Sequence, residues 1–189
     1  MAVTFNASTS SGLVTTADNS GQIAFQTNGV TYNPTLIAGT AQASTSGTSI
    51  DFTGIPAWVK RITVLFNGVS LSGTANFLLQ FGTSSGIENT GYVSTSITTD
   101  SSGNTAGVTS TAGLVWLHTN ATFIQSGMYI VANVSGNIWT SMHQGLLSST
   151  NIVGGGGNKT LSGTLDRVRI TTTNGTDTFD AGSINIMYE

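Results

Sequence analysis

Residues 59–66, Val-Lys-Arg-Ile-Thr-Val-Leu-Phe, contain the alternation of side chains that decides the fold class of this chain. Successive side chains of a β-strand point to opposite faces. Ile62, Val64 and Phe66 therefore share one face, which we expect to be buried, and Arg61 lies on the other face. The segment predicts a strand of an antiparallel sheet that has one side on a hydrophobic core.

Similar segments follow at short, regular spacing and cover residues 77–81, 113–118, 128–134, 138–144, 166–172 and 183–188. Short strands at such spacing are typical of a sandwich or a jelly roll. The many Thr, Ser, Gly and β-branched residues have low helix propensity, which argues against a helical fold. The sequence thus predicts an all-β chain whose main domain is an antiparallel, jelly-roll-like β-sandwich.

The pattern also predicts which side chains are buried. Gln80 falls between inward-facing apolar residues and is expected to point outward. Residues 113–118, Gly-Leu-Val-Trp-Leu-His, are apolar on both faces, which indicates a central strand or one that a partner covers. Trp58, Trp116 and Trp139 are expected in the core.

Residues 1–46 differ in amino-acid composition from residues 47–189 and are predicted to form a short extended N-terminal arm. They contain one acidic residue, Asp18, and no basic residue, and their clearest strand covers residues 22–27. The run of small polar residues at 40–48 is typical of a linker. Because the segment has too few large apolar residues for a core of its own, we expect it to dock onto a neighbouring subunit.

Charged residues make up only 7% of the 189-residue chain, against about 25% in ordinary domains. Polarity comes instead from 23 Ser and 32 Thr, and the net charge is −3. So little charge gives weak protection against association, which predicts that much of the surface is covered in an assembly. Five Lys and Arg in total argue against nucleic-acid binding. The chain has no Cys, no signal-peptide pattern and no long apolar run, so we expect neither disulfides nor membrane insertion.

Groups with the chemistry for catalysis are few. The eight carboxylates lie mostly in turns, where Asp usually bonds its own backbone. His118 and His143 are too few for a three-histidine zinc site. Residues 154–157 are four glycines without the Lys-Ser/Thr of a phosphate-binding loop, and they are predicted to form a flexible hairpin tip. The sequence predicts no catalytic residue, no cofactor, no metal and no enzyme activity.

Residues 101–158 contain no Lys, Arg, Asp or Glu, although they hold several aromatic residues and both histidines. Aromatic and amide groups with few charges are typical of protein interfaces and of sugar-binding faces. The candidate binding or interface residues are Tyr92, His118, Tyr129, His143 and Asn151. The candidate structural or inter-subunit charges are Lys60, Arg61, Asp166, Arg167 and Arg169.

Two long motifs resemble a module found in tail-fibre and other virion proteins of tailed bacteriophages. The first is Asp-Phe-Thr-Gly-Ile-Pro-Ala-Trp-Val-Lys-Arg-Ile at 51–62, followed by Leu-Phe-Asn-Gly-Val-Ser at 65–70. The second runs from Leu-Ser-Gly-Thr-Leu-Asp-Arg-Val-Arg-Ile-Thr at 161–171 to Asn-Gly-Thr-Asp-Thr-Phe-Asp-Ala-Gly-Ser-Ile-Asn-Ile-Met-Tyr-Glu at 174–189. With Gly91-Tyr92 between them, the resemblance spans about residues 48–189. The middle, roughly 95–158, departs from it.

The resemblance implies a structural component of a bacteriophage virion, made in the host cytoplasm, that contacts other tail, baseplate or capsid proteins. It implies a homotrimer and attachment to a glycan or protein of the host surface. The departure at 95–158 lies where a receptor-binding module is expected to vary. A short tail fibre is therefore the leading expectation, and loops 83–112 and 145–158 are expected to face the host. A capsid decoration (cement) protein or head fibre is the alternative, and a glycan-degrading tailspike enzyme is a weaker one.

Overall fold

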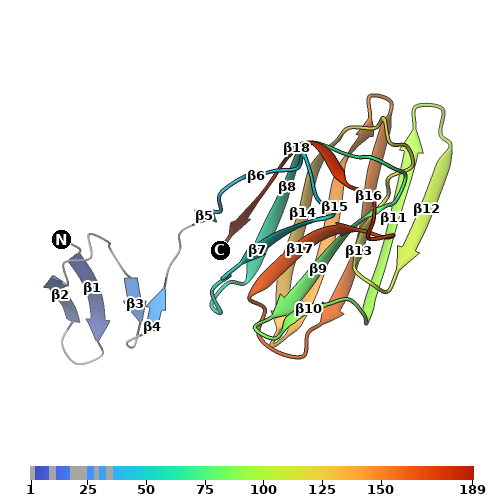
Figure 1. Cartoon of the computed structure of the whole chain (residues 1–189). Coiled ribbons are helices and arrows are strands. Elements are labelled where there is room, and N and C mark those ends of the chain that lie inside the picture. The colour runs from blue at the N-terminus through green and yellow to red at the C-terminus, as the bar shows by residue number, and fades with distance from the viewer. Residues whose placement is uncertain (1–2, 9–11, 18–24, 28–29, 33–35) are drawn as a thin grey trace. The chain divides into compact units, whose positions relative to one another are not determined.

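The computed structural model describes the backbone of residues 3–8, 12–17, 25–27 and 30–32, and the whole of residues 36–189 (Figure 1). Within these residues the secondary structure consists of strands and turns without a helix. The chain divides into two compact units, one of residues 1–36 with Glu189 and one of residues 37–188. No helix of the described part is long and apolar enough to cross a membrane.

The N-terminal unit contains a four-stranded sheet in the order β2-β1-β3-β4, formed by β1 (Val3–Ser8), β2 (Gly12–Ala17), β3 (Phe25–Thr27) and β4 (Val30–Tyr32). β1 pairs antiparallel with β2 and parallel with β3. The sequence predicted one strand over 22–27. Its last three residues form β3, and residues 22–24 lie outside the described residues. The unit is therefore a small sheet rather than a simple extended arm.

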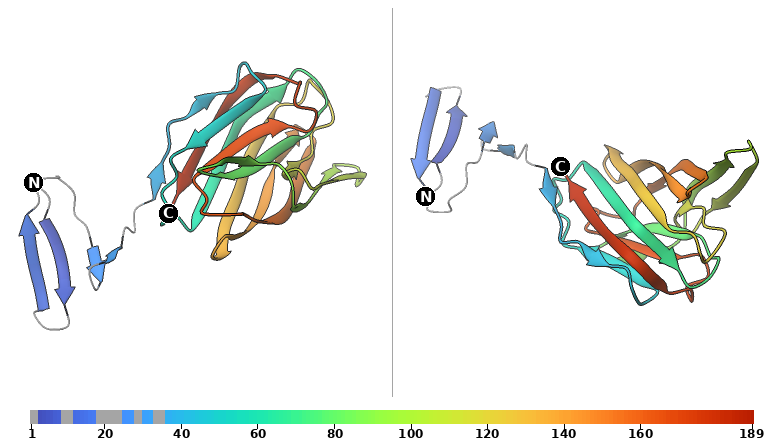
Figure 2. Two further views of the ribbon diagram at one scale, coloured as in Figure 1. Left: turned by 60° about the horizontal axis from the view of Figure 1, so that its bottom comes forward. Right: turned by 90° about the horizontal axis from the view of Figure 1, so that it is seen from above.

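The second unit is an antiparallel sandwich of two sheets, which confirms the predicted fold (Figures 1 and 2). The five-stranded sheet has the order β10-β9-β17-β7, with β13 also paired to β9; its strands are β7 (Ser49–Thr53), β9 (Phe77–Thr83), β10 (Gly86–Glu88), β13 (Leu114–Trp116) and β17 (Arg167–Thr172). The nine-stranded sheet has the order β12-β11-β16-β15-β14-β8-β18-β5, with β6 also paired to β18; its strands are β5 (Ile37–Ala38), β6 (Gln42–Ala43), β8 (Arg61–Leu71), β11 (Tyr92–Asp100), β12 (Thr105–Ser110), β14 (Gln125–Ser135), β15 (Ile138–Ser148), β16 (Asn151–Thr160) and β18 (Phe179–Tyr188).

The sandwich begins earlier than the sequence predicted. β5 and β6 pair with β18, the last strand of the chain. The predicted linker at 40–48 therefore contains a strand of the nine-stranded sheet, and the boundary between the units lies at residue 36 or 37 rather than at 46 or 47. Its small polar residues suit an edge strand as well as a linker.

The core lies between the two sheets and follows the predicted alternation. Ile62, Val64 and Phe66 of β8 are buried, as are Val168 and Ile170 of β17. Burial of such side chains is the main term that stabilises a fold of this size. The strand pattern read from local sequence is therefore the pattern that the core uses.

β13 explains why residues 113–118 are apolar on both faces. It pairs with β9 on one side, and on the other side Val115 N–H donates to the hydroxyl of Ser94 on β11, at 2.8 Å. Trp116 is fully buried, and a β-carbon on Gly127 or Gly145 would come within 3 Å of its ring. The chain itself therefore covers this strand, and glycines at inward positions of the nine-stranded sheet make room for it.

Two local predictions were wrong, and a third was right only in part. Trp58 is 41% exposed and packs at the surface against Tyr188, with ring centroids 6.0 Å apart. Gln80 lies on the outer face as predicted, opposite Arg169, but it is buried there, because the segment before β13 covers it and its amide donates to Ala112 O at 2.9 Å. Residues 154–157 lie within β16 and pair on both sides, so they form no hairpin tip.

Candidate functional site

Four of the five candidate binding residues lie inside the sandwich. Tyr92, His118, Tyr129 and His143 each retain 3% or less of their surface. Trp116 and Trp139 are buried as predicted. Such burial is at odds with a role in contacting a ligand at the surface, because these rings pack between the two sheets against residues such as Phe81, Leu114 and Trp116.

His143 is a packed imidazole. Its ring stacks on Trp116 with centroids 5.0 Å apart, and its Nε2 lies 2.9 Å from Ser96 Oγ. That hydroxyl also accepts the N–H of Leu117, at 3.1 Å. Burial lowers the pKa of His143 to about 4, so the ring is neutral at physiological pH.

His118 occupies a similar position at the end of β13. Its Nδ1 lies 3.0 Å from the amide of Gln125, and its ring meets that of Phe77 edge to face. Burial lowers the pKa of His118, although Gly73 and the nearby carboxylates of Asp177 and Asp180 oppose the shift. Both histidines are therefore neutral or weakly basic core residues that contribute to the packing between the two sheets.

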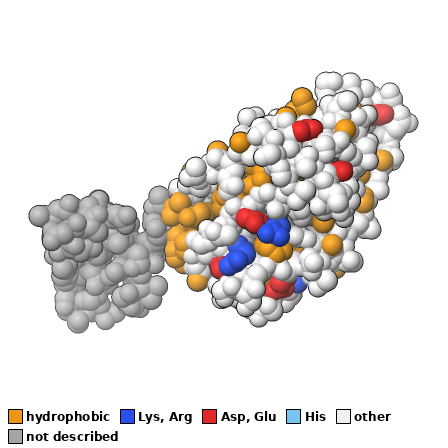
Figure 3. Space-filling view, viewed as in Figure 1, with side chains coloured by type: hydrophobic (Ala, Val, Ile, Leu, Met, Phe, Trp, Pro, Cys, Tyr) orange, Lys and Arg blue, Asp and Glu red, His pale blue; other side chains and the backbone are white. Residues whose placement is uncertain are grey.

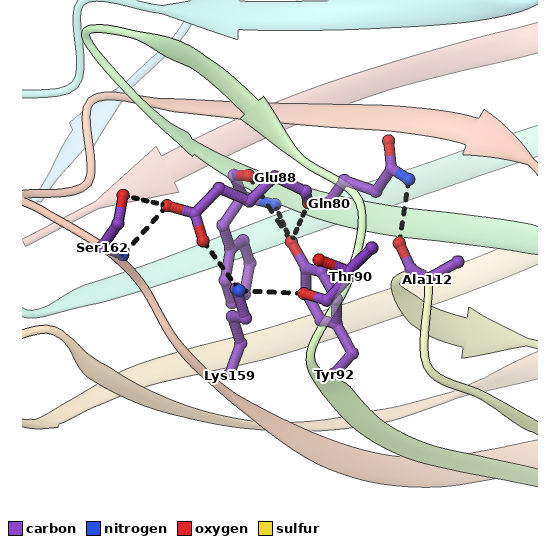
Figure 4. A network of polar contacts seen from close by, with 8 residues as sticks. Gln80, Glu88, Thr90, Tyr92, Ala112, Lys159 and Ser162 are labelled. Atoms are coloured by element: carbon purple, nitrogen blue, oxygen red, sulfur yellow. Dashed lines mark hydrogen bonds and ion pairs between the residues drawn. The ribbon is translucent and has the colours of Figure 1, made fainter.

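A partly buried ion pair, not predicted from the sequence, joins the two sheets (Figure 4). Lys159 of β16 is buried and its Nζ lies 2.7 Å from Glu88 Oε2 and 2.9 Å from the carbonyl oxygen of Thr90. Ser162 donates to Glu88 Oε1 through its N–H and its hydroxyl, at 2.9 and 2.6 Å. Burial alone would raise the pKa of Glu88, but the hydrogen bonds from Lys159 and Ser162 lower it overall.

Tyr92 completes this network from the core side. Its hydroxyl accepts the N–H of Phe81 at 2.6 Å and donates to the carbonyl oxygen of Glu88 at 2.9 Å. Lys159 Nζ lies 5.2 Å from the centre of the Tyr92 ring. A lone Lys in the charge-poor strand β16 was the only sequence signal for this pair.

Three of the five candidate charges, Asp166, Arg167 and Arg169, lie on or beside the outer face of the five-stranded sheet, where Figure 3 shows basic and acidic side chains next to one another. Arg169 binds Asp51 through two N–O contacts of 2.7 Å, and Arg167 binds Asp166 at 2.7 Å. Both pairs form within one chain. Lys60 and Arg61 lie elsewhere, at the start of β8, where Lys60 Nζ is 3.4 Å from Asn133 Oδ1.

The fifth candidate, Asn151, lies at one end of the sandwich beside a second hairpin tip. Asn151 pairs with Asp100 across β16 and β11, and Ser101 N–H donates to Thr150 O at 3.1 Å. The tips of the β11–β12 and β15–β16 hairpins therefore lie together, and Figures 1 and 2 show that both project from the body. Asn104 belongs to the same pair of tips, and its side-chain amide donates to the carboxylate of Asp100 at 2.9 Å.

The outer face of the nine-stranded sheet is the second exposed feature. It carries two grooves, of about 460 and 290 Å³. Gly156 and Asn158 line the larger groove together with Val93, and Gly154 lines the smaller one between Ile97 and Met142. The described residues hold no group of three or more His, Asp or Glu that could bind a metal. The exposed groups here are aliphatic chains, hydroxyls and amides, which bind through shape, apolar contact and hydrogen bonds.

Comparison with known proteins gives no relative: no family model, curated protein or solved structure matches this chain.

Proposed function

We propose that this chain is a structural component of a bacteriophage virion, of the short tail-fibre type, that presents its hairpin tips to the host surface. The observation that carries the proposal is the way the two phage-like motifs come together. The first motif supplies β7 and most of β8, and the second supplies β17 and β18. β7 pairs with β17, and β8 pairs with β18.

Through this pairing the two motifs form one contiguous part of the sandwich, made of β7, β8, β17 and β18 and called here the frame. Asp51 and Arg169, which belong to different motifs, bind each other directly. The stretch at 95–158, which departs from the resemblance, builds most of β11, β12, β14, β15 and β16 at the other end of the nine-stranded sheet. A constant frame that carries a variable, exposed set of strands is the arrangement expected of an attachment protein.

The side chains of the projecting tips at 100–104 and 148–151 are suited to binding a ligand rather than to catalysing a reaction. They offer hydroxyls and amides with one carboxylate, Asp100, whose pKa its bonds to Asn104 lower. Such groups can hydrogen-bond a host glycan or a polar protein surface. Single contacts of this kind are weak, so attachment would depend on several copies acting together.

Two experiments test the proposal in order. Particles of the phage whose genome encodes the chain are purified, and mass spectrometry should find the chain in washed particles. Its absence there would contradict a virion role. The purified chain should then slow adsorption of those particles to host cells, and a double variant, Asn104→Ala with Asn151→Ala, should slow it less. A chain that is present in particles but has no effect on adsorption would favour capsid decoration, and cleavage of host polysaccharide would favour a tailspike enzyme.

A further inference from the structure

We infer that the outer face of the nine-stranded sheet is a contact surface between two or more copies of this chain. This surface, called here the outer sheet face, is formed by outward side chains of β11, β14, β15 and β16. Its apolar members are Val93, Ile97, Met128, Met142, Leu146 and Ile152, which retain between 42% and 66% of their surface. The contact between copies is independent of the proposed virion role.

The apolar side chains are distributed over all four strands, with Gln144 and the outward glycines of β16 between them. Met128, Gln144, Gly154 and Ile97 form one row from β14 to β11. Leu146 lies opposite Ile152 in the next row. Taking ~150–200 Å² for a whole residue of this size, the six apolar residues expose roughly 550 Å², over half of the ~800 Å² that each partner of a standard interface buries. This exposed apolar area, although Gln144 and the glycines of β16 divide it, is comparable to the largest apolar patch on a typical monomer.

The shape of the outer sheet face favours a second copy. Gly154 and Gly156 are the outward residues at the middle of β16, and the two grooves lie over them. A β-carbon on Gly154 would be 3.5 Å from its nearest neighbour, so packing within the chain does not require glycine there. The side chains of Ile97 and Met142 stand on either side of this depression. Ridges and depressions on one face can interdigitate with the same face of another copy.

The charge distribution points to the same partner. In a two-fold symmetric contact the same face of both copies meets, so a face that carries charges of one sign brings like charges together. Residues 101–158 contain no Lys, Arg, Asp or Glu, and neither do residues 93–99. The charged residues at the margins of the outer sheet face are Arg61, opposite Ala132, and Asp100, at the end of β11. The outer face of the five-stranded sheet, by contrast, carries charged pairs of both signs such as Asp51 with Arg169.

The test measures the mass of the full chain in solution, with Met142→Asp at the centre of the outer sheet face and Thr53→Asp on exposed β7 as the matched control. The wild type and the control should have at least twice the mass of 19.4 kDa, and Met142→Asp should shift to 19.4 kDa with an unchanged circular dichroism spectrum. A monomeric wild type at about 100 µM would overturn the proposal, since that concentration exceeds the Kd of stable complexes. An unchanged mass of Met142→Asp would overturn it as well.

A second measurement remains decisive if Met142→Asp does not fold. The chain has no cysteine, so a single Cys can be placed on either face. Under mild oxidation a Cys that lies near the symmetry axis should cross-link copies of the full chain, so Val93→Cys, Met142→Cys and Leu146→Cys are each compared with Thr53→Cys, which should not cross-link. No cross-link in any of the three, or equal cross-linking of Thr53→Cys, would show that the outer sheet face is not the contact.

Discussion

The imidazole of His143 lies directly beneath Gly155, its partner across β15 and β16, so closely that a β-carbon on that glycine would come within 2.5 Å of the ring. The backbone of Thr95 on β11 closes the same space from the other side. Gly155 is therefore required by the packing of three strands. Its neighbour Gly154 faces outward, where a β-carbon would make one ordinary van der Waals contact, 3.5 Å from the carbonyl oxygen of His143.

Gly155→Ala should destabilise the sandwich by about 1–3 kcal/mol, because the added methyl forces apart backbone and ring atoms that cannot move separately. Gly154→Ala is the matched control, and its free energy of unfolding should change little or rise, since alanine restricts the unfolded chain. Urea denaturation of both variants measures the difference. Equal stability of the two would show that β16 does not pack as described.

Acid should destabilise the sandwich through His143, whose pKa falls to about 4 in the folded state. The unfolded chain binds a proton near pH 6.5, whereas the folded chain does not until about pH 4, so stability is lost as the pH falls through this window. The loss from this residue is up to about 3 kcal/mol. His143→Gln should flatten the stability profile between pH 6.5 and 4 relative to wild type. Taking the difference between the two profiles removes the contributions of His118 and the carboxylates. Parallel profiles would contradict a buried neutral imidazole.

Glu88→Gln should cost about 1.5–3 kcal/mol, because it leaves the buried ammonium of Lys159 without its carboxylate partner. Asp166→Asn is the control, since its pair with Arg167 is more exposed and screened by water, and it should have a much smaller effect. Thermal and urea unfolding at pH 7 compare the two. A second change, Lys159→Met, should recover part of the stability lost in Glu88→Gln, because no charge then remains buried. If Glu88→Gln and Asp166→Asn lowered the free energy of unfolding by equally small amounts, the Glu88–Lys159 pair would contribute no more than a surface contact.

The tryptophans should differ in the stability they contribute. Trp116→Ala should cost about 3–5 kcal/mol, because its ring is fully buried against inward-facing glycines. Trp58→Ala should cost only about 1 kcal/mol, because this ring is partly exposed and packs mainly on Tyr188. The fluorescence of Trp58 should also be the more accessible to a soluble quencher. A larger loss of stability from Trp58→Ala would place that ring in the core.

The amino-acid pattern was sufficient for the fold class, for the burial of alternate residues such as Ile62, Val64, Val168 and Ile170, and for seven strands of the sandwich, which are β8, β9, β13, β14, β15, β17 and β18. These are properties of neighbouring residues, because the two-residue period of a strand and the turn preferences of Gly and Asn act over a few positions. The pattern was not sufficient for β11, β12 and β16, which contain many Thr, Ser and Gly residues and few large apolar ones.

The stacking of the two sheets, which local patterns do not encode, sets which aromatic rings are buried. Tyr129 and His143 are covered by Leu114 and Trp116 of β13, a strand of the five-stranded sheet, and Tyr92 packs against Phe81 of β9. The Asp51–Arg169 and Glu88–Lys159 pairs, and the meeting of the tips at Asp100 and Asn151, join residues far apart in the chain. Such contacts depend on how sheets stack and strands order themselves, and no local pattern of side chains encodes that arrangement.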